Sequence, residues 1–202
     1  MKKEIKITLV ILGICLLFVG IVSGVVVGLN HKNRNETESD NITIGNISNL
    51  DDFYNSEIVG NYEDIRTLSE SYSKEQAQID NCFVIGAMVH NDYLYSEFMD
   101  KYNKKEDAFI RVVQSTVEGD IFIIDLLYDS KEDKIYIVKD DTRDKFATQE
   151  DRTIKYKVYE KTGEWKYQNS LYWIVYNGKL PDGVNYEFTI NSDQLFIIAT
   201  IN

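Results

Sequence analysis

The clearest alternation of apolar and polar positions lies in the middle of the chain. Residues 109–117 alternate loosely, Glu118-Gly119-Asp120 has the composition of a turn, and residues 121–128 follow as the apolar run IFIIDLLY. Two such runs joined by a short glycine-containing turn predict a β-hairpin. After a second polar turn, residues 134–139 carry apolar side chains at successive positions, which predicts a strand with both faces partly covered.

The C-terminal part of the chain shows the same pattern of short apolar runs separated by polar turns. Residues 154–159 and 171–176 are rich in β-branched and aromatic side chains and predict two further strands. The only proline lies in the turn Leu-Pro-Asp-Gly at residues 180–183. Beyond this turn, we expect residues 186–190 and 195–201 to close the chain as strands.

Two short helices are expected ahead of the hairpin. Ser73 and Gln76 fit a capping box that starts a helix over residues 74–80, and a short buried strand follows at residues 83–85. Asn91 is placed to cap a second helix, whose apolar residues recur at helical spacing and predict a core-facing stripe of Leu94, Tyr95, Phe98, Met99 and Tyr102.

These elements predict an α+β fold. We expect two N-terminal helices packed on a mainly antiparallel sheet of about seven strands, because the strands follow one another through short polar turns. We also expect one transmembrane helix to precede this domain.

The expected transmembrane helix is an uncharged run of 23 residues, Ile7 to Leu29, which follows the short leader 1–6. As a helix it would be about 34 Å long, enough to cross a hydrocarbon core of about 30 Å. The run is longer than the apolar region of a cleaved signal peptide, which predicts an uncleaved anchor. Lys2, Lys3 and Lys6 favour a cytoplasmic leader, so we expect a single-pass protein of the cell membrane with an extracellular C-terminal domain.

The segment after the apolar run is rich in Asn, Ser and acidic residues and has no clear period. Such a composition predicts a flexible tether over residues 30–58, with a marginal helical turn at residues 50–54. The extracytoplasmic α+β domain is then expected over residues 59–202.

Charge and cysteine content narrow the functional classes. The formal net charge of −11 argues against nucleic-acid binding, which needs clustered Lys and Arg, whereas it permits a basic partner. The two cysteines are Cys15, in the apolar run, and Cys82. A disulfide scaffold is therefore excluded, and Cys82 is expected to be a small buried side chain at the start of a strand.

Residues that carry common catalytic or metal chemistry are few. His31 lies in the expected tether, which leaves His90 alone, just ahead of the second helix. A catalytic triad needs a base and a zinc site needs clustered Cys and His, so neither is expected. No glycine-rich phosphate loop occurs in the sequence. We therefore expect no cofactor, no metal and no catalytic residue, and an enzyme is less expected than a binding protein.

The candidate binding residues are charged positions in and after the predicted hairpin: Glu118, Asp120, Asp141, Arg143 and Asp144. Two interpretations of Arg143 stay open. Its planar fork can bridge neighbouring carboxylates or turn carbonyls and so fix the point where the chain leaves the sheet. Alternatively, it lines a pocket for an acidic ligand. Acidic turns without further pattern are more typical of solvated loops than of calcium or glycosidase sites.

Several stretches resemble a known family. They are Tyr72-Ser73-Lys74-Glu75-Gln76-Ala77, Asp80-Asn81-Cys82-Phe83-Val84-Ile85, Lys104-Lys105-Glu106-Asp107, residues 110–120 (IRVVQSTVEGD), Asp125-Leu126, Tyr128-Asp129 and residues 141–146 (DTRDKF). Over about residues 70 to 165 they are similar to a domain-of-unknown-function family of secreted lipoproteins and membrane-anchored proteins of Gram-positive, spore-forming bacteria. The chain departs from that pattern at Ile121, where many relatives carry proline, and the resemblance ends before Leu171. It implies a location and carries over no functional residue.

The function expected from these observations is a membrane-anchored, extracytoplasmic binding or interaction module at the bacterial envelope. Its partners would be the membrane, through Ile7 to Leu29, and an envelope protein or another basic partner. Two alternatives stay open: an inhibitor of a hydrolase, and an enzyme with a site built from Asp and Arg residues.

Overall fold

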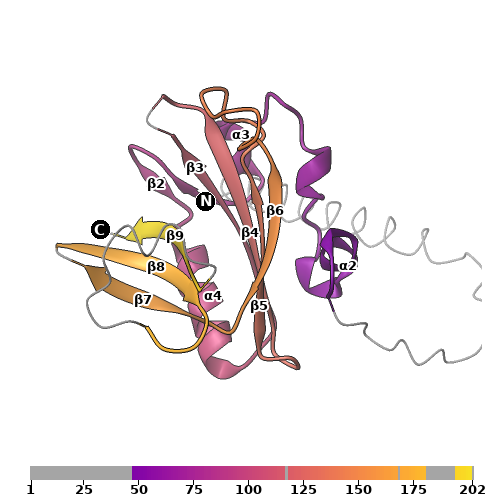
Figure 1. Ribbon diagram of the computed structural model, residues 1–202, viewed down its shortest axis with the longest axis vertical. Coiled ribbons are helices and arrows are strands. Elements are labelled where there is room, and N and C mark those ends of the chain that lie inside the picture. Colours follow the sequence, from indigo (N-terminus) through magenta and orange to yellow (C-terminus); the bar gives the residue numbers. More distant parts are fainter. Residues whose placement is uncertain (1–46, 117, 168, 181–193, 202) are drawn as a thin grey trace, which may run out of the picture. The chain divides into compact units, whose positions relative to one another are not determined.

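The computed structural model describes residues 47–116, 118–167, 169–180 and 194–201 (Figure 1). The helical elements are short, apart from α4, and the strands make up most of the regular structure. In chain order the elements are α2 (Leu50–Asn55), the 3-10 helices η1 (Glu57–Val59) and η2 (Ile65–Thr67), α3 (Lys74–Ile79), β1 (Phe83–Ile85), β2 (Val89–His90), α4 (Tyr93–Lys104), β3 (Ala108–Ser115), β4 (Ile121–Asp129), β5 (Lys134–Asp140), β6 (Ile154–Tyr159), β7 (Lys161–Tyr167), β8 (Ser170–Tyr176) and β9 (Leu195–Ile201).

A six-stranded main sheet forms the centre of the described part, in the order β2-β1-β3-β4-β5-β6. The β1–β3 pair is parallel and the other pairs are antiparallel. The predicted hairpin is confirmed as β3 and β4, with Ser115 opposite Ile121 and Arg111 opposite Asp125. Strand β5 is buried along most of its length, as the successive apolar positions predicted.

One face of the main sheet packs against α4 and a second, three-stranded sheet in the order β7-β8-β9. Trp173 of β8 is fully buried and makes edge contacts with Tyr95 and Phe98 of α4. Its indole nitrogen donates a hydrogen bond to Thr162 of β7 at 2.7 Å, which satisfies the one polar atom of this large side chain. The second sheet is therefore joined to α4 through aromatic side chains.

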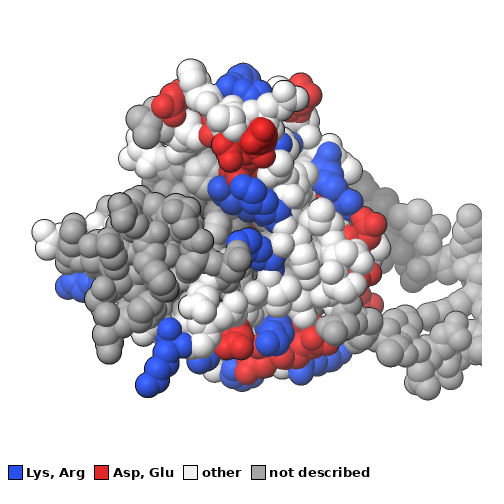
Figure 2. All heavy atoms as spheres, viewed as in Figure 1, with Lys and Arg blue, Asp and Glu red and all other residues white. Residues whose placement is uncertain are grey.

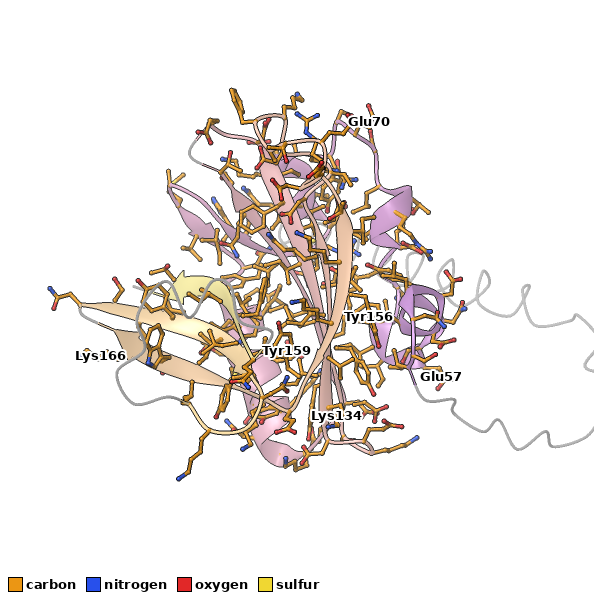
Figure 3. All side chains as sticks on the ribbon, in the orientation of Figure 1. Glu57, Glu70, Lys134, Tyr156, Tyr159 and Lys166 are labelled. Carbon is orange, nitrogen blue, oxygen red and sulfur yellow. The ribbon has the colours of Figure 1, made fainter. Side chains whose placement is uncertain are left out.

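The opposite face is covered by residues 47–73, here named the N-terminal segment, together with α3. Phe53 and Ile65 of this segment are fully buried against β3, β4 and β5. Figure 1 shows α2 and the second sheet on opposite sides of the main sheet. The alternation along β6 agrees, because Tyr156 packs with the N-terminal segment whereas Tyr159 packs on the other face (Figure 3).

The prediction of two N-terminal helices on one sheet of about seven strands was wrong, because the described residues form nine strands in two sheets. Only α4 reaches seven residues among the helices of the described part. A helix of six residues, such as α3, offers less than two turns and cannot cover a sheet face. Strand β7 escaped prediction because its sequence, KTGEWKY, has few apolar positions.

Some predictions fall on residues that the structure does not describe. The expected transmembrane helix, Ile7 to Leu29, and the expected strand at residues 186–190 lie outside the described ranges. Among the residues that are described, no helix is long and apolar enough to cross a membrane.

The two predicted helix starts have different outcomes. Ser73 caps α3, since its side chain accepts a hydrogen bond from the Gln76 amide at 3.3 Å. Asn91 does not cap α4, which begins after Asp92 and has no side-chain cap. Instead, the Asn91 amide group donates to the carbonyl oxygens of Gln78 and Cys82, so that it joins the end of α3 to the start of β1.

Residues 47–58 belong to the folded part, although we expected them to end a flexible tether. Asn49 caps α2 through the amides of Asp51 and Asp52, which gives this six-residue helix a defined start. The Tyr156 hydroxyl also donates to the Ile47 carbonyl at 2.9 Å. The segment folds because its few apolar side chains find a partner surface on the sheet, which its composition does not reveal.

Truncation of Phe53 tests whether residues 47–58 are part of the fold. Phe53→Ala empties a fully buried site, so we expect a loss of about 3–5 kcal/mol in the free energy of unfolding, measured by urea titration. Asn55→Ala, on an exposed position of the same helix, serves as the control and should change it little. Equal stabilities of the two variants would show that the segment is a tether after all.

Candidate functional site

A hollow of about 700 Å³ lies between the N-terminal segment, α3 and β3. Its walls are mostly polar, since they combine serine hydroxyls, amide groups, two tyrosines and two carboxylate residues. The residues that line it include Asn61, Tyr62, Glu63, Tyr72, Asp80 and Arg111. We name it the first hollow.

Arg111 forms the floor of the first hollow, and it is held there by an ion pair with Asp125, which does not itself line the hollow. The Nε and Nη2 atoms of Arg111 both lie 2.7 Å from the carboxylate oxygens of Asp125. The two side chains are 2% and 0% exposed, so the pair is almost fully buried. The pair arises from the hairpin register, which sets these residues opposite each other on the face that carries the N-terminal segment.

The N-terminal segment supplies the remaining partners of this ion pair. Tyr54 donates its hydroxyl to Asp125 at 2.8 Å, and the Glu63 carbonyl accepts a hydrogen bond from Arg111 Nη2 at 2.6 Å. The ring of Tyr62 lies 5.4 Å from the guanidinium carbon, within the range of a cation–π contact. A buried charge pair is tolerated only when such further hydrogen bonds satisfy it, so the segment and the pair depend on each other.

The charge state of this cluster follows from its surroundings. Burial opposes the charge of Arg111, but the Asp125 carboxylate outweighs burial and holds the pKa of Arg111 above its usual value. Burial, followed by the negative charge of Asp125, raises the pKa of Tyr54. Burial also raises the pKa of Tyr62 to about 12. At physiological pH, Arg111 is therefore charged, and the phenols of Tyr54 and Tyr62 beside it are neutral.

One nitrogen of Arg111 is left for a ligand. The guanidinium uses Nε and Nη2 for Asp125 and for the Glu63 carbonyl, so Nη1 lies on the side of the fork away from that carboxylate. No atom of the described residues accepts a hydrogen bond from Nη1. Since Arg111 lines the first hollow, this nitrogen can donate to an oxygen atom of a bound molecule.

The wall opposite Arg111 comes from Tyr72 and α3. Asp80 accepts hydrogen bonds from the Tyr72 hydroxyl at 2.9 Å and from the side-chain Nε2 of Gln76 at 2.8 Å, so its carboxylate is held in place at the rim. The thiol of Cys82 lies behind Tyr72, at 3.6 Å from its hydroxyl, and is fully buried. Burial raises the pKa of Cys82 to about 11, which keeps it a protonated, unreactive thiol as its expected structural role requires.

Arg143 lies behind this wall, and its side chain is 8% exposed. It forms an ion pair with Asp140, which is almost fully buried, and donates to the carbonyl oxygens of Leu68 and Ser69. Leu68 and Ser69 themselves line the first hollow. These contacts match the first interpretation of Arg143, which bridges a carboxylate and loop carbonyls and thereby positions the wall of the hollow.

The other predicted binding residues lie in turns and loops and do not line the first hollow. Asp120 accepts from the Lys145 amide at 2.8 Å, and Asp144 accepts from the amides of Phe146 and Ala147. Asp141 pairs with Lys139 at 2.7 Å. Glu118 is exposed. Asp120, Asp141, Arg143 and Asp144 thus gather where the chain leaves β5, while Glu118 projects from the hairpin turn.

Sequence reasoning missed Arg111 and Asp125, although a signal was present. Each is a single charged residue inside an apolar strand sequence, FIRVVQ and IFIIDLLY. Charged side chains at core positions require a partner, and a hairpin brings the two strands that carry these residues side by side. The register that sets Arg111 opposite Asp125 differs by two residues from the one that the predicted turn implied. The N-terminal segment gave no comparable signal, because its contribution consists of loop residues and a backbone carbonyl.

No group of three or more His, Cys, Asp or Glu residues suited to a metal ion occurs among the described residues. Residues 78–172 match the model of a family described as a domain of unknown function (DUF4362). The chain therefore contains a domain of this kind, and the resemblance is confirmed to that extent. No curated protein and no solved structure matches the chain.

The matched residues include Asp80, Arg111 and Asp125 but exclude the N-terminal segment. The floor of the first hollow and one acidic residue of its rim therefore lie in the matched region, whereas Tyr62, Glu63 and Tyr72 precede it. The complete hollow depends on both parts of the chain.

Removal of the Arg143 side chain tests its positioning role. Arg143→Ala leaves the Asp140 carboxylate buried without its cation, so we expect the thermal midpoint to fall by several degrees. Lys145→Ala, which removes an exposed cation two residues away, should leave the midpoint almost unchanged. An unchanged midpoint in Arg143→Ala together with lost ligand binding would favour the pocket interpretation instead.

Proposed function

We propose that the described domain is a binding module and that its ligand presents a positively charged group to the first hollow. The observation that carries this proposal is the distribution of charge around the hollow. The Glu63 carboxylate has no partner among the described residues, and Asp80 accepts only from neutral donors. The charge of Arg111, by contrast, is already balanced by Asp125.

The acidity of the whole chain supports a basic ligand. A net charge of −11 attracts cations and steers their approach, while it disfavours nucleic acids and other polyanions. On the face seen in Figure 2, acidic and basic side chains are intermixed, so the negative charge does not form one field there. Specific recognition of a cation would therefore depend on the hollow and its carboxylates.

The proposal places this module at the outer side of a bacterial cell membrane. Its support is the apolar run Ile7 to Leu29, which is long enough for a membrane helix and follows a basic leader. The partner would be an envelope protein or another basic molecule.

The hollow offers little support for the enzyme alternative. Glu63 and Asp80 are both exposed, so neither carboxyl group lies in the enclosed, water-poor surroundings typical of an active site. Cys82 is a protonated, buried thiol and cannot serve as a nucleophile. The arginine of the hollow is Arg111, which is committed to Asp125, and not the predicted Arg143.

Binding of a simple cationic probe tests the proposal. We expect the full-length chain, purified in detergent, to bind a fluorescent, amidated tetra-arginine peptide and to ignore tetra-glutamate in anisotropy titrations. Glu63→Gln removes one charged acceptor of nearly the same shape, so the dissociation constant should rise about tenfold.

Glu118→Gln provides the matched control, since it makes the same change at an exposed position of the hairpin turn. It should leave the affinity within a factor of about two. Equal affinities of the wild type, Glu63→Gln and Glu118→Gln would mean that tetra-arginine binds by general charge attraction, and the proposal would fail.

A further inference from the structure

A second hollow, of about 440 Å³, adjoins the first. Both hollows are lined by Asn61 and Tyr62, so these two residues form the partition between them. The second hollow has an apolar wall from Ile58, Val59 and Phe109, and it is also lined by the charged residues Glu57, Lys101 and Asp107. The two hollows therefore differ in chemistry: the first is lined mostly by polar side chains, whereas the second combines an apolar wall with charges of both signs.

Strand β3 sets the distance between the two hollows. Phe109 lies in the second hollow and Arg111 in the first, and both point to the face that carries the N-terminal segment. Residues two apart in a strand are separated by about 7 Å. The ring of Tyr62 spans this step, at 4.8 Å from the Phe109 ring and 5.4 Å from the Arg111 guanidinium carbon.

In an extended polypeptide, the distance between side chains two positions apart equals the distance between Phe109 and Arg111 along β3. The side chains of such a polypeptide at positions i and i+2 point to one side and lie about 7 Å apart, so one can enter each hollow. A basic side chain suits the first hollow, where Glu63 and Asp80 stand at the rim. An apolar side chain suits the second, against Ile58 and Phe109. The free Nη1 of Arg111 is a donor for a peptide carbonyl of the same segment.

A saccharide chain fits these features less well. Its hydroxyl groups could donate to the serine, amide and carboxylate side chains of the first hollow, but a neutral sugar carries no positive charge to balance Glu63 and Asp80. Its hydroxyl-rich surface also offers less apolar area to Ile58 than an aliphatic side chain does. The combination of charge, apolar surface and spacing favours a peptide.

We propose that the two hollows form one groove, which binds an extended segment of a partner protein. The segment carries a basic residue for the first hollow and an apolar residue two positions away for the second. This inference rests on the proposed function, since it identifies the chemical class of the cationic ligand, and it adds the requirement for the second hollow and for a fixed spacing.

Synthetic peptides of identical composition test whether the basic and the apolar residue must lie two positions apart. Acetylated, amidated decapeptides of Gly and Ser carry one Arg and one Leu, placed either two positions apart or adjacent, in both orders. Titration of the full-length chain in detergent should give about tenfold tighter binding of the better two-apart peptide than of the adjacent peptides, because only then can both side chains be buried. Replacing Leu by Ser in the peptide should abolish this advantage.

Protein variants assign the two side chains to the two hollows. Ile58→Ser should remove the advantage of the two-apart peptide and leave tetra-arginine binding unchanged, whereas Glu63→Gln should weaken both. Thermal unfolding of each variant shows whether it is folded, and the Leu-to-Ser peptide carries the same test on the unchanged protein.

The outcomes separate this inference from the proposed function. Equal binding of adjacent and two-apart peptides, with tetra-arginine binding still sensitive to Glu63→Gln, would overturn the groove and retain a cation site. Binding of a chitin tetramer with no response to any peptide would overturn both.

Discussion

The buried ion pair between Arg111 and Asp125 is the interaction on which the described structure depends. It stands between two neighbouring strands at the centre of the main sheet, and its remaining hydrogen-bond partners come from outside that sheet. A pair so enclosed is costly to desolvate and depends on further hydrogen bonds to its charged groups. Tyr54 and the Glu63 carbonyl meet this requirement, and in doing so they fix the N-terminal segment on the sheet.

This dependence explains why the first hollow exists where it does. The segment that covers the sheet is held at Tyr54 and Glu63, and it is held again by Arg143 at Leu68 and Ser69. Between these attachments Ile65 is buried in the core, while residues on either side of it line the hollow with Arg111. The matched domain region supplies Arg111, while the residues before it supply most of the wall. Differences in the segment would therefore change the lining of the hollow without changing the sheet.

The sequence was sufficient to predict elements whose pattern is local. The β3–β4 hairpin, strand β5 and the Ser73 cap depend on residues close together in the chain, and each was confirmed. The division into two sheets was not predictable in this way, because it depends on where Trp173 packs and not on the strand sequence around it. The ion pair of Arg111 and Asp125 was predictable only in part. The hairpin brings the two strands together, but the contacts with Tyr54 and Glu63 that hold the N-terminal segment depend on residues far away in the sequence.

The measurement that tests this account most directly is amide hydrogen exchange, by mass spectrometry, of the Arg111→Lys variant. Lysine keeps the charge opposite Asp125 but cannot also hold the carboxylate through two nitrogens and reach the Glu63 carbonyl. The account predicts at least about tenfold faster exchange in residues 47–73 and unchanged exchange in β7 and β8, which lie on the other side of the sheet. Unchanged protection of residues 47–73 would show that the ion pair does not hold the segment and would contradict the account.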